Sequence, residues 1–245
     1  MESIILCGGE AKRMKPYLPF NKALAEIKPG ITLIEHQIHW LTSLGIDRII
    51  LAIDLETHRT LKAKGLTFTD EVECSVEVER LGTGGAILKA VEQVESSFFY
   101  VMNVDDLLIS ETYTPFNLLT ILQENPEVQG SVLLSRARFP FGIVETSNSR
   151  VTGFRQKPVL DHKVCTGHYA FTKTGVRKYF PLKGNFEDSA LQTMADNSVL
   201  NSLELEGEWI TVNNIKQLEA ATQSLQTSNR KRHVYRHWVG YRSTS

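Results

Sequence analysis

The sequence predicts an α/β fold with a mostly parallel sheet that helices cover on both faces. Residues 3–6, 48–53, 75–78 and 98–102 form short apolar runs of the kind found in buried strands. Stretches with apolar residues at helical spacing lie between these runs. Strands that alternate with helices in this way are typical of βαβ units, whose crossover helices pack on both faces of a sheet.

Two helical segments connect the first strands. The first ends at the stop signal of Gly45 and carries its apolar residues three or four apart: Leu33, Ile34, Ile38, Leu41 and Leu44. The second follows Gly84 and Gly85 and places these residues on one side: Ile87, Leu88, Val91 and Val94. The strand at 98–102 then ends in the run Asn103-Val104-Asp105-Asp106.

The second half of the chain is less regular. Strands are predicted at 129–135, 165–171 and 200–205, and helices at 186–195 and 214–225. Residues 141–145 and 151–156 have the pattern of a hairpin around Asn148-Ser149. No internal repeat or Pro/Gly-rich linker divides the chain, so we expect one domain over residues 1–226 and a basic extension over 227–245.

Composition limits the class of protein. The chain has 245 residues, of which 42% are hydrophobic and 22% charged, which excludes a mainly disordered chain. No apolar run approaches the ~20 residues of a membrane span, so no membrane partner is expected. Three cysteines form no disulfide framework or paired metal motif, which favours a reducing, cytoplasmic setting.

The charge is unevenly distributed. The net charge is -1, from 27 basic and 28 acidic residues, yet no acidic residue follows Glu219. Five basic residues lie beyond that point: Arg230, Lys231, Arg232, Arg236 and Arg242. With its interleaved aromatic residues this tail could stack on single-stranded nucleic acid. A solvated tail, or one that clasps a second subunit of a homo-oligomer, is the favoured interpretation, so nucleic acid is not an expected partner.

The loop after the first strand is the strongest functional signal. Gly8 and Gly9 allow a sharp turn in which successive backbone N–H groups can bind phosphate oxygens. Four cations follow at Lys12, Arg13, Lys15 and Lys22. A tight turn with solvated cations is the alternative. The spacing matches neither a dinucleotide-binding Gly-x-Gly-x-x-Gly nor a Walker loop.

This loop resembles the opening motif of the sugar-1-phosphate nucleotidylyltransferases, with Gly8, Gly9, Arg13, Pro16 and Lys22 on the family's places. Five further segments resemble the family in order up to about residue 221: 81–86, 103–105, 141–144 with 151–158, 166–171, and 209–214 with 218–219. The nearest motifs are those of members similar to mannose- or heptose-1-phosphate guanylyltransferases.

The resemblance implies a Rossmann-like three-layer αβα sandwich with a mixed, mostly parallel sheet of the nucleotide-diphospho-sugar transferase type. It implies an enzyme that transfers NMP from an NTP to a sugar 1-phosphate, releases pyrophosphate and forms an NDP-sugar in nucleotide-sugar biosynthesis. Two alternatives stay open. One is transfer to a non-sugar phosphate or phosphonate, such as phosphocholine or a polyol phosphate, and the other is a catalytically weak nucleotide-sugar-binding subunit.

The resemblance also assigns roles to residues. Catalysis falls to Arg13, Lys22 and Asp105, and the Mg²⁺ cofactor to Asp105 and Asn213. The nucleotide-binding residues are Leu6, Gly8, Gly9, Glu10, Gly82, Thr83, Gly84 and Gly85. The sugar phosphate would meet Gly142, Gln156, Lys157 and Thr166. The three glycines of 82–85 would let the backbone approach a flat base, although a helix N-terminus with a flexible lead-in is the plain alternative.

Several positions depart from the family pattern. Ala11, Lys12, Asn21 and Val104 replace Gly, Thr, Pro and Gly, and Thr211 takes the place of a metal-binding Asp, for which Asn213 could substitute. On the sugar side, Gln156 replaces a Glu and Cys165 an Asn. Because the triphosphate side is kept and the sugar side is altered, we expect an unusual acceptor.

Four other polar positions are assigned no catalytic role. Asp106 is expected to point away from the site and is the weaker metal candidate beside Asp105. His168, on an apolar strand, is interpreted as a packed residue. His36 and His39 lack the further ligand that a metal site needs.

Overall fold

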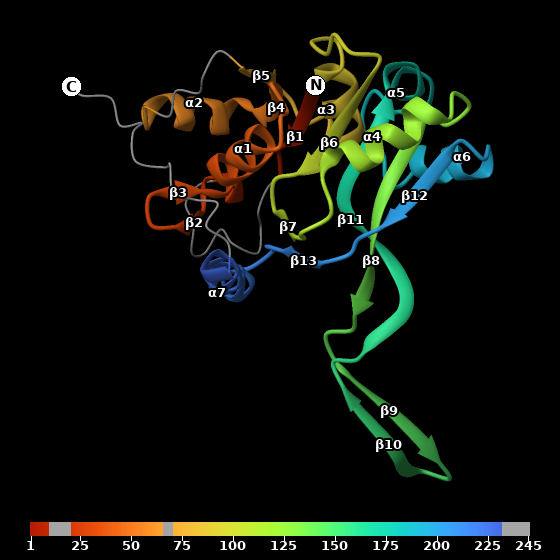
Figure 1. Ribbon diagram of the computed structural model, residues 1–245. Coiled ribbons are helices and arrows are strands. Elements are labelled where there is room, and N and C mark those ends of the chain that lie inside the picture. The colour runs from red at the N-terminus through yellow and green to blue at the C-terminus, as the bar shows by residue number, and fades with distance from the viewer. Residues whose placement is uncertain (10–20, 66–70, 232–245) are drawn as a thin grey trace.

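The computed structural model describes residues 1–9, 21–65 and 71–231, and for 227–231 the backbone alone. Its centre is a seven-stranded sheet in the order β12-β8-β11-β6-β1-β4-β5 (Figure 1). The strands are β1 (Glu2–Leu6), β4 (Arg48–Asp54), β5 (Val72–Glu77), β6 (Phe98–Asn103), β8 (Gly130–Arg138), β11 (Val159–Thr172) and β12 (Leu200–Glu204).

The sheet is mixed and mostly parallel, as predicted. β1 pairs in parallel with β4 and with β6, β4 with β5, and β8 with β12. Only β11 runs against its neighbours β6 and β8 within this sheet. Because parallel strands end at the same edge, the segments that follow β1 and β6 emerge side by side.

Helices cover both faces of the sheet. Alternate residues of the central strands enter two separate cores, with Ile5 and Leu51 in one and Ile4 and Ile50 in the other. The first core includes side chains of α1 (Leu33–Ser43), α2 (Leu55–Ala63), α4 (Pro115–Glu124) and α7 (Ile215–Lys231). The second includes side chains of α3 (Gly82–Ala90), α5 (Lys173–Tyr179) and α6 (Ala190–Asp196). The predicted three-layer sandwich is therefore confirmed.

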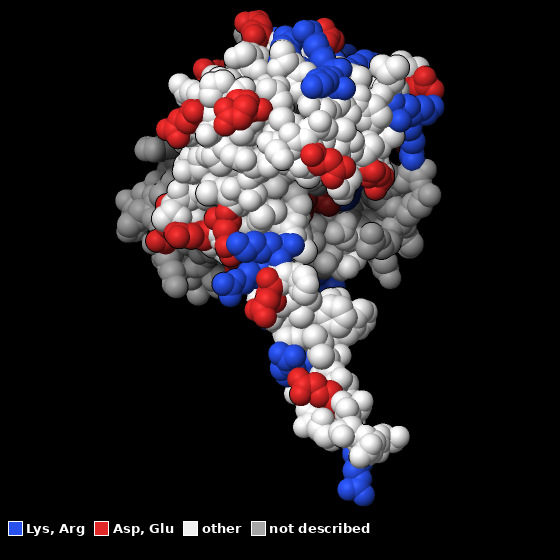
Figure 2. Space-filling view, turned by 90° about the vertical axis from the view of Figure 1, so that its right-hand side faces the viewer, with Lys and Arg blue, Asp and Glu red and all other residues white. Residues whose placement is uncertain are grey.

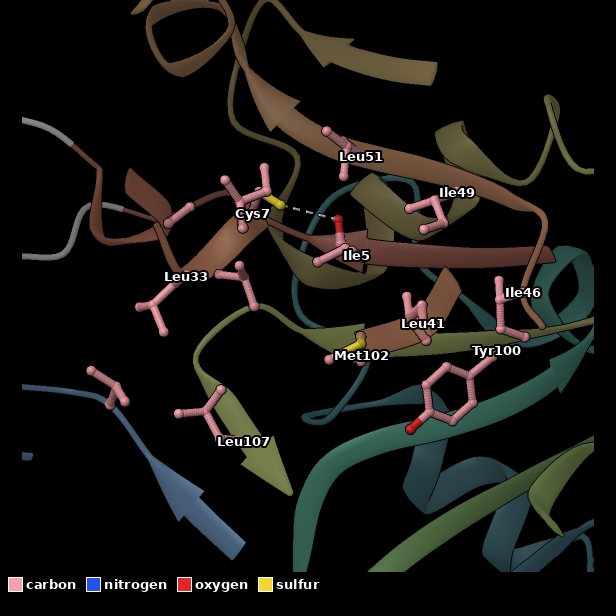
Figure 3. Close-up of a cluster of buried hydrophobic side chains, with 14 of the residues drawn as sticks. Ile5, Cys7, Leu33, Leu41, Ile46, Ile49, Leu51, Tyr100, Met102 and Leu107 are labelled. Carbon is pink, nitrogen blue, oxygen red and sulfur yellow. Dashed lines mark hydrogen bonds between the residues drawn. The ribbon is translucent and has the colours of Figure 1, made fainter. Parts of the chain in front are cut away.

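Figure 3 shows part of the first core, in which labelled side chains of β1, β4 and β6 lie with those of α1. Ile5 of β1 and Met102 of β6 lie beside Leu41 of α1, and the thiol of Cys7 donates a hydrogen bond to the Ile5 carbonyl oxygen over 3.6 Å. Cys7 is fully buried, so it packs as the small apolar residue that its place after a strand predicts.

Short elements that the periodicity did not predict lie around the sheet edge. β7 (Asp106–Ile109) pairs antiparallel with β13 (Glu208–Thr211), and β2 (Glu26–Lys28) pairs with β3 (Ile31–Thr32). Lys22–Leu24 forms one turn of 3₁₀ helix. These pieces are two to four residues long, too short to show a hydrophobic period.

The predicted hairpin is present but stands away from the body. β9 (Gly142–Ser147) and β10 (Arg150–Gln156) pair with each other in a separate two-stranded sheet. Asn148 and Ser149 have φ of 47° and 63°, which suits the tight turn that joins two strands. We call this hairpin the arm. It projects beyond the body, and charged side chains of both signs lie along it (Figures 1 and 2).

The helix predicted at 214–225 is longer than expected. α7 continues to Lys231, so the expected boundary between 226 and 227 falls inside a helix. The rest of the basic extension, residues 232–245, lies outside the described residues.

Candidate functional site

The segments after β1 and β6 meet at one edge of the sheet. The N–H of Cys7 donates to the Ala52 carbonyl at 2.9 Å, and the N–H of Val104 donates to the Leu6 carbonyl at 3.2 Å. These bonds place the start of the loop after β1, which contains Gly8 and Gly9 and which we call the glycine loop, beside residues 103–106. The structure therefore brings together two of the segments that the sequence singles out.

The backbone at Gly8 and Gly9 is open to solvent. Both residues are exposed, and Gly9 has a φ of +130°, which side-chain-bearing residues rarely adopt. Among the described residues, no atom lies within 4 Å of a Cβ atom built on Gly9. The backbone conformation by itself therefore favours glycine there. Glu10 and Arg13, which were assigned to the nucleotide and to catalysis, lie outside the described residues.

Asn21 connects the glycine loop to the residue that follows it. Its Nδ2 donates to the Cys7 carbonyl at 2.9 Å and to Asp54 Oδ2 at 3.2 Å, while its Oδ1 accepts from the N–H of Ala23 at 3.0 Å. That last bond caps the 3₁₀ turn that begins with Lys22. The replacement of the family's Pro by Asn therefore has a structural role, which sequence reasoning missed because the partners are distant in the chain.

Lys22 and Asp105, the two catalytic candidates among the described residues, form an ion pair. The Lys22 ammonium contacts Asp105 Oδ2, and the two side chains are only 18% and 12% exposed. Lys22 comes from the turn after the glycine loop and Asp105 from the loop between β6 and β7. A cation and a carboxylate predicted to act together are thus adjacent.

Asp106 is more deeply embedded than the sequence suggests. Its Oδ2 accepts from Asn103 Nδ2 at 2.9 Å, and its Oδ1 accepts from Trp209 Nε1 at 2.9 Å. Thr211 of β13 is the cross-strand partner of Asp106. Burial, together with the nearby charge of Asp105, raises the pKa of Asp106 from 3.8 to about 6. Asp106 was expected to point away from the site, whereas its carboxylate is buried beside Asp105 and bonds Asn103 and Trp209. Two adjacent carboxylates after a strand were the available signal.

Asn213, the second metal candidate, follows β13 at the same edge. The N–H of Val212 donates to the Asp105 carbonyl at 2.9 Å. Asn213 is the next residue, so its backbone lies close to residues 103–106. Its own N–H donates to Gln217 Oε1 at 2.8 Å, and its Nδ2 donates to Thr211 Oγ1 at 2.8 Å. Among the described residues no group of three His, Cys, Asp or Glu side chains could hold a metal. A magnesium site here would draw on one carboxylate, one amide oxygen and the substrate phosphates.

The glycines of 82–85 lie against the 181–184 loop. A Cβ on Gly82, whose φ is +75°, would lie 2.6 Å from the Gly184 backbone, and one on Gly85 would lie 2.5 Å from the Leu182 carbonyl oxygen. The N–H of Gly84 donates to the Gly184 carbonyl at 2.9 Å. Close approach of the 181–184 loop therefore requires glycine at these positions, and the role of this segment in binding a base stays a prediction. The Thr83 hydroxyl donates to Glu187 Oε2 at 2.5 Å.

The structure does not gather the four sugar-phosphate candidates. Gly142 and Gln156 lie on the arm and Lys157 follows it, whereas Thr166 is fully buried on β11, where its hydroxyl donates to the Leu133 carbonyl at 3.0 Å. Figure 1 shows the arm well clear of β7 and β13, where Asp106 and Thr211 lie. Thr166 therefore supports the sheet, and the arm residues lie apart from the Lys22–Asp105 pair.

His168 and His36 are buried, whereas His39 is half-buried. His168 is fully buried; its Nδ1 lies 2.5 Å from the Tyr100 hydroxyl and its Nε2 donates to the Asp106 carbonyl at 3.0 Å. Burial lowers the pKa of His168 from 6.5 to about 3, and that of His36 to about 4. The packing interpretation of His168 is confirmed, and through Asp106 it also supports the site.

A model of one protein family, described as nucleotidyl transferase, matches residues 2–228. The chain belongs to the nucleotidyl transferase family. The match begins in β1 and ends in α7, so it includes every described residue of the site.

Named relatives agree with this assignment. The nucleotidyl transferase is 28% identical over 246 residues to "Mannose-1-phosphate guanyltransferase" of Schizosaccharomyces pombe, with 94% of this chain and 66% of the relative aligned. It is 26% identical to "Mannose-1-phosphate guanylyltransferase catalytic subunit beta" of Danio rerio, with 86% and 61% aligned. The chain therefore spans about two thirds or less of the length of these relatives.

Solved structures share the fold. The crystal structure of HddC from Yersinia pseudotuberculosis aligns with a TM-score of 0.67 at 20% identity, over 91% of this chain and 99% of that one. A putative glucose-1-phosphate thymidylyltransferase from Bacillus anthracis gives a TM-score of 0.67 at 19% identity, over 91% and 94%. Within the described part of the nucleotidyl transferase, no helix is long and apolar enough to cross a membrane.

Proposed function

We propose that this nucleotidyl transferase joins an NMP unit from an NTP to a sugar 1-phosphate and releases pyrophosphate. The observation that carries the proposal is the Lys22–Asp105 pair beside the open backbone of Gly8 and Gly9, at the carboxyl edge of parallel strands. Ligands of open α/β sheets bind at this edge. The family of the chain and the printed names of its relatives support the same reaction.

Nucleotidyl transfer depends on positioning of the substrates and neutralisation of their charge more than on covalent catalysis. An oxygen of the sugar phosphate forms a bond to the α-phosphorus, the bond from that phosphorus to the bridging oxygen breaks, and pyrophosphate leaves with the electron pair. Because the nucleophile is already an anion, it needs no general base. The protein must instead bring two anions together and balance their charge.

The described residues supply these functions. The N–H groups of Gly8 and Gly9 would bind triphosphate oxygens. Lys22, which neutralises Asp105 in the free protein, would move its ammonium onto the phosphates as substrate arrives. A magnesium ion, held by Asp105 and the Asn213 amide oxygen, would add positive charge on the triphosphate. Asp105 would thus pair with Lys22 in the free protein and with the magnesium ion when substrate is bound. Its carboxylate would have a positive partner in both states.

The arm would hold the acceptor. Gln156 and Lys157 offer an amide and an ammonium at the base of the hairpin, and both side chains are exposed. Because they lie apart from Lys22 and Asp105, the arm and the body would contact different substrates. The exchange of the family's Glu and Asn for Gln156 and Cys165 favours an unusual acceptor, so non-sugar phosphates belong among the compounds to be tested.

The test is pyrophosphate release from the purified protein with Mg²⁺, using five NTPs in turn and a panel of acceptors. Because the named relatives are guanyltransferases, GTP with mannose 1-phosphate is the first pair. The other acceptors are hexose, heptose and polyol phosphates and phosphocholine. We expect acceptor-dependent release that Asp105→Asn abolishes. Absence of release with every pair, from protein that still binds an NTP, would overturn the proposal and favour a binding subunit.

A further inference from the structure

Gln37 is a polar residue in the apolar stripe of α1. It stands one helical turn after Leu33 and one turn before Leu41, which lie in the core that Figure 3 shows. All three residues are buried, and Gln37 is only 2% exposed. A buried amide costs free energy unless its polar atoms find partners. An apolar side chain of similar size would avoid that cost, so the amide at this position needs an explanation.

The partners of this amide lie on both sides of Asp105. Gln37 Nε2 donates to the Val104 carbonyl oxygen at 3.2 Å and to the Asp106 carbonyl oxygen at 2.9 Å. Both bonds are buried, and they join α1 to residues that lie 67 and 69 positions later in the chain. Because an amide nitrogen carries two hydrogens, Gln37 uses both of them here. It therefore bridges the carbonyl groups of the residues before and after Asp105.

The segment around Asp105 is held at each of its three carbonyl groups. Gln37 binds those of residues 104 and 106, and the N–H of Val212 donates to that of Asp105 at 2.9 Å. His168 Nε2 of β11 also donates to the carbonyl of residue 106, at 3.0 Å. Bonds of this kind fix the backbone, and the backbone sets the direction in which the Asp105 side chain leaves it.

The same helix is bonded to the turn that carries Lys22. The N–H of Leu33, the first residue of α1, donates to the Ala25 carbonyl at 2.8 Å. The N–H of Ala25 in turn donates to the Lys22 carbonyl at 3.0 Å. α1 therefore reaches the backbone of the Lys22 turn at its start and the backbone of the Asp105 segment one turn later. Both members of the ion pair are referred to one rigid element.

We propose that Gln37 is a positioning residue, which ties the Asp105 segment to the helix that also anchors Lys22 and thereby sets where the Asp105 carboxylate lies for a divalent cation. The inference rests on the proposed function only in taking Asp105 as a cation ligand. It explains the amide in the apolar stripe, because two carbonyl oxygens need two donors at one place. Leu and Met have no donor, and an ionised Glu has none either.

The test is binding of Mn²⁺ to the full-length protein in the presence of saturating GTP, followed by electron paramagnetic resonance. Gln37→Met exchanges one unbranched side chain for another and removes both donors. We expect it to weaken Mn²⁺ about tenfold, as removal of a partner of a metal ligand commonly does. Gln37→Asn keeps an amide that is one methylene too short to bridge both carbonyls, so it should weaken Mn²⁺ by a smaller factor. It serves if circular dichroism shows that Gln37→Met does not fold.

Gln129→Met is the matched control. Gln129 is half-buried, and its Oε1 accepts from the hydroxyls of Thr172 and Thr174 at 2.6 and 3.0 Å. Thr172 is the cross-strand partner of Phe98 at the start of β6, whereas Asp105 follows the end of β6. The same substitution therefore removes two hydrogen bonds at the opposite edge of the sheet. It is expected to leave the Mn²⁺ affinity unchanged.

A second measurement separates positioning of Asp105 from general support of the fold. In an Asp105→Asn background, Gln37→Met is expected to change the Mn²⁺ affinity less than about twofold, since no carboxylate is left to position. Equal weakening in both backgrounds, wild-type affinity in the folded Gln37 variants, or no Mn²⁺ binding by the wild type overturns the inference. Absence of pyrophosphate release would overturn the proposed function instead. The cation measurement needs no turnover, so the two failures are distinguishable.

Discussion

Lys22 and Asp105 lie 83 residues apart in the chain and form an ion pair at the carboxyl edge of the sheet. Each residue is held in place by hydrogen bonds of its own segment. Asn21 caps the turn that begins with Lys22, and Asp105 follows β6 and bonds through its carbonyl to Val212. The pair therefore depends on two independent segments, which makes it a sensitive point for mutation.

Removal of one charge of this pair should cost more than removal of both. Lys22→Gln leaves Asp105 beside Asp106 without a positive partner among the described residues, so the free energy of unfolding should fall by about 1–3 kcal/mol. Lys22→Gln combined with Asp105→Asn should recover about 1 kcal/mol of that loss. Urea denaturation of the wild type, both single variants and the double variant measures the coupling. Strict additivity of the two changes would mean that the ion pair does not stabilise the fold.

Asn21→Ala should lower both the stability of the protein and the affinity of the loop after β1 for NTP. The change removes the cap on Ala23 and the bonds to Cys7 and Asp54. We expect a loss of about 1–2 kcal/mol in stability and a weaker NTP affinity. Isothermal titration with an NTP analogue measures the affinity. Thr42→Ala, which removes an exposed helix hydroxyl far from the loop in the chain, is the control. Equal NTP affinity in both variants would contradict the prediction.

Gly82→Ala should be strongly destabilising because of the 181–184 loop. The added Cβ would lie 2.6 Å from the Gly184 backbone, at a residue with a φ of +75°. Gly65→Ala is the matched control, since its φ is +64° and a Cβ there meets no described residue within 4 Å. We expect about 1 kcal/mol for Gly65→Ala from conformation alone and about 3 kcal/mol or more for Gly82→Ala. If urea denaturation shows similar losses of unfolding free energy in the two variants, the close contact with the 181–184 loop is not the reason for glycine at position 82.

Stability should fall as the pH falls from about 6.5 toward 3. His168 has its pKa lowered to about 3 in the folded protein, so below 6.5 the unfolded chain binds a proton that the folded one does not. At pH 5 this difference amounts to about 2 kcal/mol relative to pH 8. His36, with a pKa lowered to about 4, acts in the same direction. Urea denaturation at both pH values measures the loss.

His168→Gln should reduce that pH dependence. Gln cannot take up a proton, so the difference between pH 8 and pH 5 should shrink even though the variant is less stable at pH 8. His162→Gln, on an exposed part of β11, is the control and should leave the difference unchanged. An undiminished pH dependence in His168→Gln would show that another group is responsible.

Lys157→Ala should affect the acceptor and not the NTP. Since Lys157 follows the arm while Lys22 and Asp105 lie on the body, we expect the KM for the acceptor to rise about tenfold or more with the KM for NTP unchanged. Arg150→Ala, an exposed change beside the turn of the arm, is the control. Steady-state kinetics with each substrate varied in turn gives both constants. An equal rise in both KM values would place Lys157 with the triphosphate instead.

The main strands and the chemistry of the glycine loop follow from the sequence alone. β1, β4 and β6 are continuous apolar runs, and such runs are a local signal that needs no knowledge of the partner strand. Gly8, Gly9 and Lys22 likewise stand together in the chain. The position of Asp105 directly after β6 places it at the carboxyl edge once the sheet is parallel.

Only the tertiary structure decided which residues bind one another across that edge. The contacts of Asp106 with Trp209 and Thr211, of Asn21 with Cys7, and of Gly82 with Gly184 join segments far apart in the chain. No periodicity encodes such pairs. They form because burial leaves polar groups without water and requires partners, and those partners are set by the packing of distant strands and loops. For the same reason the burial of Asp106 beside Asp105 and the distance of the arm from the Lys22–Asp105 pair were not foreseen.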